Sequence, residues 1–181
     1  GIDVKEYDLS HLRREIGMVL QDVFLFSDTI RNNITLGNAG ISDEQIIEAA
    51  KMVGVHNFIM QLPGNYDYNV MERGATLSVG QRQLISFVRA MVQNPNIIVL
   101  DEATSSIDTE SEELIQSAIE KLMKGRTAVV IAHRLSTIQK ADKIVVVDKG
   151  NIVEMGTHEQ LLKKEGAYAN LYEMQYAAAL A

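Results

Sequence analysis

The chain has 181 residues, of which 46% are hydrophobic, and a formal net charge of -7 with a sequence pI near 5.1. This composition can bury a core, and it argues against global disorder and against a general nucleic-acid binder, which needs a basic footprint. The lack of cysteine excludes disulfides and thiolate metal sites, and the apolar runs are far shorter than the roughly 18 to 20 residues of a membrane span.

Apolar spacing and capping residues predict the elements of the first half of the chain. Ser42 with Gln45 forms a capping-box pattern, and Ser78 can cap a later helix. The expected elements are a helical turn at 9–14, a strand at 15–20, a helix capped by Ser27 or Asp28 that runs to about 34, helices at 43–53 and 55–62, and a helix from 78 to about 93.

Short apolar runs predict strands in the second half. Thr109 with Glu112 repeats the capping-box pattern, and Gly125 ends the helix that follows. The expected elements are strands at 97–100 and 127–132, a helix from 109 to 124, a short helix at 136–140, a β-hairpin of 143–147 with 151–155, and helices at 157–164 and from 166 to about 176.

The alternation of strands and helices predicts an α/β fold, in which helices cover both faces of a parallel sheet. A helical run from about 28 to 93 interrupts this alternation. We therefore expect an inserted helical subdomain there, with the remainder of residues 1–181 forming the core of a single domain.

Asp101 and Glu102 follow a buried strand, where open α/β sheets bind their ligands. One carboxylate there can hold Mg²⁺, directly or through water, and a second can take a proton from an attacking water. The alternative is that the pair merely begins a loop. The apolar residues before it and the small residues after it favour the site.

Ser78 and Gly80 lie at a predicted helix start. Unpaired N–H groups and the helix dipole favour an anion there, and the serine hydroxyl can donate to a phosphate oxygen. An ordinary N-cap is the alternative for the serine alone.

Gln21 and His133 each follow a predicted strand. Alone, the first can be a loop residue and the second a structural histidine. Together with Asp101 and Glu102 they lie at the ends of three strands, and parallel strands bring those ends together.

Five motifs resemble those of ATP-binding-cassette (ABC) ATPases, occur in that family's order and cover essentially the whole chain. They are the signature motif Leu-Ser-Val-Gly-Gln-Arg-Gln at 77–83, the Walker B strand with its catalytic glutamate at 97–102, the D-loop at 105–108, the Q-loop glutamine Gln21 and the switch histidine His133. The resemblance implies a P-loop NTPase (RecA-like) α/β fold with an inserted α-helical signature subdomain.

Further motifs resemble the exporter branch of that family, whose members export drugs or lipids. They are the Q-loop version at 21–34 and Glu72-Arg73-Gly74, which is similar to the exporter X-loop. Val79 departs from the commoner glycine, although valine recurs in exporter signatures. The resemblance implies a nucleotide-binding domain at the cytoplasmic face of a membrane, within an integral membrane transporter and joined to its transmembrane domain.

The resemblance also implies ATP and Mg²⁺ as cofactors. Two nucleotide-binding domains would close head to tail around two ATP molecules, with no nucleic-acid partner. For the chain's own nucleotide, Asp101 would hold Mg²⁺, Glu102 would polarise water, His133 would contact the γ-phosphate, and Gln21 would link the metal to the transmembrane domain. The partner's nucleotide would be contacted by Ser78, Val79, Gly80, Gln81 and Asp108.

The phosphate-binding Gly-x-x-x-x-Gly-Lys-Ser/Thr loop of this family has no counterpart in the chain, which contains no Gly-Lys dipeptide. We therefore expect the C-terminal portion of an N-terminally truncated domain. In the family's sheet the absent strand lies between 127–132 and 143–147, so apolar strand edges would be exposed. We predict that the chain alone is marginally stable and does not hydrolyse ATP.

The sequence leaves two alternative functions. A non-catalytic module could lend its signature half-site to a partner's ATP. A DNA-repair or chromosome-type ABC ATPase is disfavoured by the acidic charge, the exporter-type Q-loop and the lack of a long heptad insertion between Gln21 and Leu77.

Overall fold

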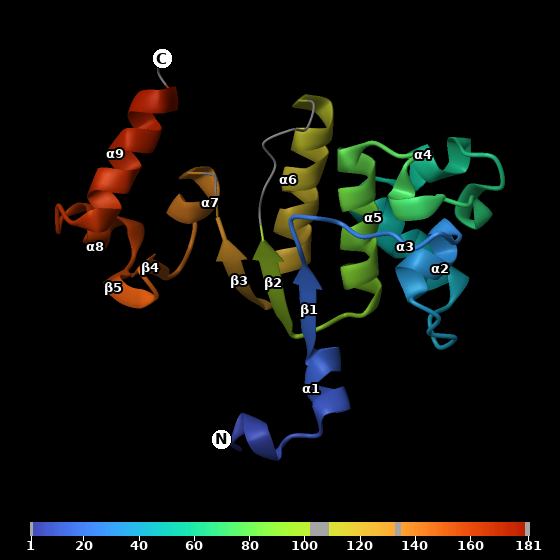
Figure 1. The fold of residues 1–181 in the computed structure, drawn as a ribbon, viewed down its shortest axis with the longest axis horizontal. Coiled ribbons are helices and arrows are strands. Elements are labelled where there is room, and N and C mark those ends of the chain that lie inside the picture. The colour runs from blue at the N-terminus through green and yellow to red at the C-terminus, as the bar shows by residue number, and fades with distance from the viewer. Residues whose placement is uncertain (1, 102–108, 133–134, 180–181) are drawn as a thin grey trace. The chain divides into compact units, whose positions relative to one another are not determined.

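The structure, a computed structural model, describes residues 2–101, 109–132 and 135–179 (Figure 1). Contacts between residues divide the chain into two compact units, Gly1–Ile131 and Ala132–Ala181. Glu102, Asp108 and His133, three of the residues expected to act on ATP, lie outside the described residues.

The first unit contains a parallel sheet of the three predicted strands, in the order β1-β2-β3. They are β1 (Ile16–Val19), β2 (Ile97–Asp101) and β3 (Thr127–Ile131). Val19 pairs with Leu100, and Leu100 pairs with Val130, so all three strands run to the same edge of the sheet. The predicted α/β class with a parallel sheet is confirmed.

The helices α5 (Val79–Val92) and α6 (Thr109–Met123) pack against one face of this sheet. The helical elements of the unit are η1 (Val4–Glu6), α1 (Leu9–Glu15), α2 (Ile30–Thr35), α3 (Asp43–Val53), α4 (His56–Gln61), η2 (Asn65–Asp67), η3 (Glu72–Gly74), α5 (Val79–Val92) and α6 (Thr109–Met123). Buried side chains of β1 and β2 join those of α5 and α6 in one apolar core, because alternate strand residues point to one face.

The opposite face of the sheet is apolar and exposed. Met18 is 61% exposed, and Val129 and Ile131 are each 54% exposed, whereas Val19 and Leu100 on the packed face are buried. Within the described part of this unit, helices pack on one face of the sheet, and the cover expected on the second face is not among them.

Side-chain hydrogen bonds to backbone N–H groups mark where several helices begin. Ser42 and Gln45 form the predicted capping box of α3. The expected cap of α2 was wrong by one residue or more, because Thr29 rather than Ser27 or Asp28 accepts the N–H of Asn32. α6 includes Thr109 in its first described turn, and the Thr109 cap stays a prediction.

The second unit holds a hairpin and three helices among its described residues. The elements are α7 (Leu135–Gln139), β4 (Ile144–Asp148), β5 (Asn151–Gly156), α8 (His158–Leu162) and α9 (Ala167–Ala179). The strands pair antiparallel as predicted, with an irregular register between Val146 and Val147. Leu161 is fully buried against Val146 and Tyr168. Across the described ranges, no helix has the length and apolar character needed to cross a membrane.

Candidate nucleotide site

Gln21 and Asp101 come from the carboxyl ends of adjacent strands. Asp101 is the last residue of β2, and Gln21 follows the end of β1 by two residues. Since the strands are parallel and Val19 pairs with Leu100, both residues lie at one edge of the sheet. The expectation that strand ends meet is confirmed for these two positions.

The Asp101 side chain points away from the helices. It alternates along β2 with Ile98 and Leu100, which are buried in the core, and it is itself half-buried. Its register partner is Ile131 at the end of β3. A carboxylate in this position is accessible to a ligand on the uncovered face of the sheet.

The helix α5 begins with a reciprocal pair of hydrogen bonds. The Gln81 N–H donates to Ser78 Oγ (3.1 Å), and the Ser78 N–H donates to Gln81 Oε1 (2.9 Å). This capping box satisfies two backbone donors. The spacing of Ser78 and Gln81 is visible in the sequence, because it is the same Ser-x-x-Gln pattern that predicted the start of α3. The side chain of Gln81 therefore supports Ser78, a role that the sequence reasoning missed.

Two backbone donors remain at this helix start. The N–H groups of Val79 and Gly80 have no hydrogen-bond acceptor among the described residues. Ser78 and Val79 are exposed, Gly80 is buried, and the Ser78 hydroxyl can still donate its proton. The arrangement fits an anion such as a phosphate group, because unpaired N–H groups and the helix dipole both favour negative charge.

The loop before α5 is held by the helix itself. Arg82 donates from Nη1 to the carbonyl oxygen of Leu77 (2.6 Å) and more weakly to that of Gly74 (3.5 Å). Gly74 has a φ of +69°, which favours glycine, and its backbone lies against Arg82 and Leu25. These contacts set the path of the chain into Ser78.

A buried network joins the segment after Gln21 to α5, and sequence reasoning missed it. Its centre is Asn33 of α2, whose exposure is 0%, together with the half-buried Arg89 of α5. Burial lowers the pKa of Arg89. The only sequence signal was an asparagine directly before Ile34 in a predicted helix.

The described side chains fit a magnesium ion that keeps water and phosphate ligands. Within the described ranges, no group of three or more His, Asp or Glu side chains could hold a metal. Mg²⁺ commonly binds through one or two carboxylates, with waters and substrate phosphates completing its shell. Asp101 fits that pattern as a single carboxylate.

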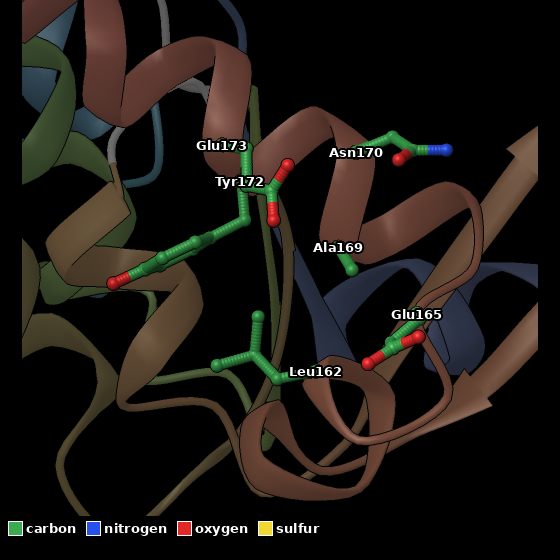
Figure 2. Close-up of a pocket in the computed structure, with 6 residues that line it drawn as sticks. All are labelled: Leu162, Glu165, Ala169, Asn170, Tyr172 and Glu173. Atoms are coloured by element: carbon green, nitrogen blue, oxygen red, sulfur yellow. The ribbon is translucent and has the colours of Figure 1, made fainter.

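A separate pocket lies in the second unit and is built from α8, α9 and the turn between them (Figure 2). None of the residues expected to act on ATP lines it. The lining residues are Leu162, Glu165, Ala169, Asn170, Tyr172 and Glu173.

Comparisons with known proteins agree with these motifs. The family described as ABC transporter matches residues 1–105. A Staphylococcus aureus protein described as a multidrug export ATP-binding/permease protein is 53% identical over 175 residues, which cover 97% of this chain and 30% of that protein. The Bacillus subtilis ABC transporter ATP-binding protein YknV is 54% identical over 180 residues, which cover 99% of this chain and 30% of that protein.

A solved structure is similar as well. The ATP-bound structure of a bacterial Atm1-family ABC exporter has a TM-score of 0.81 and 43% sequence identity, covering 92% of this chain and 29% of that one. The chain spans about 30% of the length of the curated relatives it matches. By sequence and by fold, this chain belongs to the ABC transporter family.

Proposed function

We propose that the chain is the ATP-hydrolysing part of an ABC exporter, and that ATP hydrolysis there powers transmembrane export. The observation that carries this proposal is the start of α5, where Ser78 and two unpaired N–H groups form a phosphate-compatible surface. The strand-end position of Asp101 beside Gln21 supports it. The name of the Staphylococcus aureus relative, which combines an ATP-binding part with a permease, supports export as the process.

Bound ATP with Mg²⁺ supplies the transferable phosphoryl group and neutralises its charge. We assign Asp101 to the metal, with Gln21 at the adjacent strand end as a second oxygen donor. Glu102 would accept a proton from the attacking water, and His133 would donate to a phosphate oxygen. Catalysis by such residues depends on their positions and charges, since phosphoryl transfer needs little covalent chemistry from the protein.

The signature half-site serves a second nucleotide in this proposal. Ser78, Val79 and Gly80 would face the nucleotide of another ABC nucleotide-binding domain, in a head-to-tail dimer, while Gln81 holds Ser78. Asp108 would cross the interface between the two domains. The exposure of Ser78 and Val79 supports an outward-facing surface. Association with a transmembrane domain would place the chain at the cytoplasmic face of a membrane.

The test replaces the matching region of the Staphylococcus aureus relative with this chain and measures ATPase activity of the grafted exporter in lipid vesicles. We expect Mg²⁺-dependent turnover that Glu102→Gln lowers about 100-fold or more, because it removes the general base. The control is Glu113→Gln, which makes the same change at an exposed position of α6 and should leave turnover intact. A graft without turnover contradicts the proposal.

The second candidate, a non-catalytic module, predicts a different result. If Glu102→Gln leaves turnover unchanged while Ser78→Ala abolishes it, the chain only lends its signature half-site to a partner's ATP. The favouring observation is that the described part of the signature half-site is complete in itself, with its capping box formed.

A further inference from the structure

We propose that Arg89 is a positioning residue that ties the segment after Gln21 to the signature helix α5, so that Gln21 and Ser78 move as one body. This inference rests on the function proposed above, because it concerns how the two half-sites of that function are kept in register. Arg89 itself reaches neither the nucleotide nor the metal in this proposal.

Arg89 donates three hydrogen bonds to the region that follows Gln21. Its Nε donates to the carbonyl oxygen of Asn33 (2.7 Å), Nη1 donates to the carbonyl oxygen of Phe24 (3.3 Å), and Nη2 reaches Asn33 Oδ1 (3.4 Å). Phe24 lies only three residues after Gln21. The guanidinium fork can hold three oxygens on two segments, whereas an ammonium group cannot reproduce that geometry.

Asn33 extends this hold along the same segment. Its Oδ1 accepts the N–H of Phe26 (2.8 Å), and its Nδ2 donates to the carbonyl oxygens of Phe26 (3.0 Å) and Thr29 (3.0 Å). Because Asn33 is fully buried, each of these groups would be costly to leave unpaired. The backbone from Phe24 to Thr29 is thus held by two side chains in contact with each other.

A second contact joins the same segment to the loop before α5. The fully buried Leu25 packs against Gly74, with Leu25 Cδ1 3.1 Å from the position of a Cβ built on that glycine. Arg82 bonds the carbonyl oxygens of Gly74 and Leu77, immediately before Ser78. The segment therefore touches the chain before α5 through Leu25 and the third turn of α5 through Phe24.

These two ties explain why the segment and the helix move together. Arg89 lies eleven residues after Ser78 on one unbroken helix, a distance of about 16 Å along its axis at ~1.5 Å per residue. A packed helix of this length transmits displacement as a rigid body. A movement of the segment after Gln21 is therefore passed to Ser78, and the reverse.

The alternative is that Arg89 only stabilises the fold, and Arg126 provides a matched control. Arg126 also donates three hydrogen bonds, to the carbonyl oxygens of Pro95 (3.0 Å) and Leu122 (2.8 Å) and to Asn94 Oδ1 (2.8 Å). It joins the end of α6 to the turn before β2 and contacts neither Phe24 nor Asn33. Arg126→Lys thus removes a comparable set of bonds elsewhere.

The first test measures amide hydrogen exchange in the 181-residue chain. In Arg89→Lys we expect the Phe26 N–H to exchange about tenfold faster, since charge-assisted hydrogen bonds around its acceptor are lost. Arg126→Lys should leave this amide within about twofold of the unsubstituted chain. Unchanged exchange at Phe26 in Arg89→Lys overturns the proposal. Arg89→Gln is the second variant, should Arg89→Lys fail to fold.

The second test measures kcat and KM for ATP in the grafted exporter. We expect Arg89→Lys to lower kcat about tenfold with KM within about twofold, because misplacement of Gln21 and Ser78 affects the reacting geometry more than binding. Arg126→Lys should change neither. Equal losses in both variants would show a merely structural role and overturn the proposal. If the unsubstituted graft is inactive, the proposed function fails, and the exchange measurement alone decides whether Arg89 holds the segment.

Discussion

Gly74 illustrates how a single residue shapes the approach to the signature helix. Its φ of +69° favours glycine, and a Cβ added there would lie 2.8 Å from Arg82 Cδ and 3.1 Å from Leu25 Cδ1. Gly37 has a similar φ of +76° but nothing within 4 Å of its added Cβ. Substitution of Gly37 therefore tests backbone strain alone, whereas substitution of Gly74 tests strain together with steric crowding.

We predict that Gly74→Ala lowers the free energy of unfolding by about 2–4 kcal/mol, because strain at positive φ adds to a steric clash. Gly37→Ala should cost only about 1 kcal/mol, the strain alone. Urea unfolding of both variants measures the difference. Equal costs would contradict the close packing of Gly74 against Arg82 and Leu25.

Ser78 and Ser42 cap different helices with the same hydrogen-bond pattern. We predict that Ser78→Ala and Ser42→Ala each lower the free energy of unfolding by about 1 kcal/mol, the usual cost of a lost cap. Only Ser78→Ala should also lower ATP turnover in the grafted exporter. Parallel effects of both variants on turnover would argue against a ligand at the start of α5.

At the scale of elements, the turn η2 is attached to α4 through a tyrosine–histidine pair. The Tyr66 hydroxyl lies 2.9 Å from His56 Nδ1, and the tyrosine is buried in the core. Burial raises the pKa of Tyr66, partly offset by the charge of Arg31. Burial, with a contribution from Tyr172, also raises the pKa of Tyr168 in the second unit.

These raised pKa values predict that the free energy of unfolding falls at alkaline pH. The folded chain holds the tyrosine protons more tightly than the unfolded chain does. The protonated tyrosines therefore contribute fully to the free energy of unfolding below the unfolded pKa of about 10, and this contribution is lost as pH rises through the folded pKa. We expect Tyr66→Phe to reduce the fall in unfolding free energy above about pH 10. The exposed Tyr7→Phe is the control and should leave the slope as it was. The same slope in both variants would contradict the prediction.

Element types followed from local sequence, whereas some boundaries did not. Ser42 with Gln45 identified the start of α3 because both partners of a capping box lie within one turn. The start of α2 depends on Thr29, whose neighbour Asp28 bonds the Thr29 N–H and the Asn32 side chain instead. Neighbouring residues that can each cap a helix are not distinguished by sequence spacing.

At the scale of the whole molecule, one face of the three-stranded sheet presents apolar side chains to solvent. They are Met18 of β1 and Val129 and Ile131 of β3, and β3 is an edge of the sheet as described. Exposed apolar edges and faces promote association. The expectation from sequence concerned strand edges rather than this face, and it stays a prediction.

We predict that the 181-residue chain self-associates and that Val129→Thr combined with Ile131→Thr reduces this association, since both side chains point to the uncovered face. Val130→Thr is the control, because its side chain points to the packed face and should cost stability without improving solubility. Light scattering after size-exclusion chromatography measures both effects. A monomeric unsubstituted chain would contradict the prediction.

We also predict that the chain by itself shows no Mg²⁺-dependent ATP hydrolysis, since it contains no Gly-Lys dipeptide and hence no phosphate-binding loop of the usual kind. Phosphate release by the purified chain measures this. Robust turnover that requires Mg²⁺ would show that the chain hydrolyses ATP without that loop.

The sequence by itself determined the family, the α/β class and the positions of Gln21, Ser78 and Asp101, because short motifs and strand periodicity are local properties of the chain. Only the tertiary structure decided that β1 lies beside β2, where Leu100, the register partner of Val19, follows it by 81 residues. It alone also showed the contact of Arg89 with Asn33 and Phe24. Such hydrogen bonds join residues distant in sequence, and no local spacing encodes them.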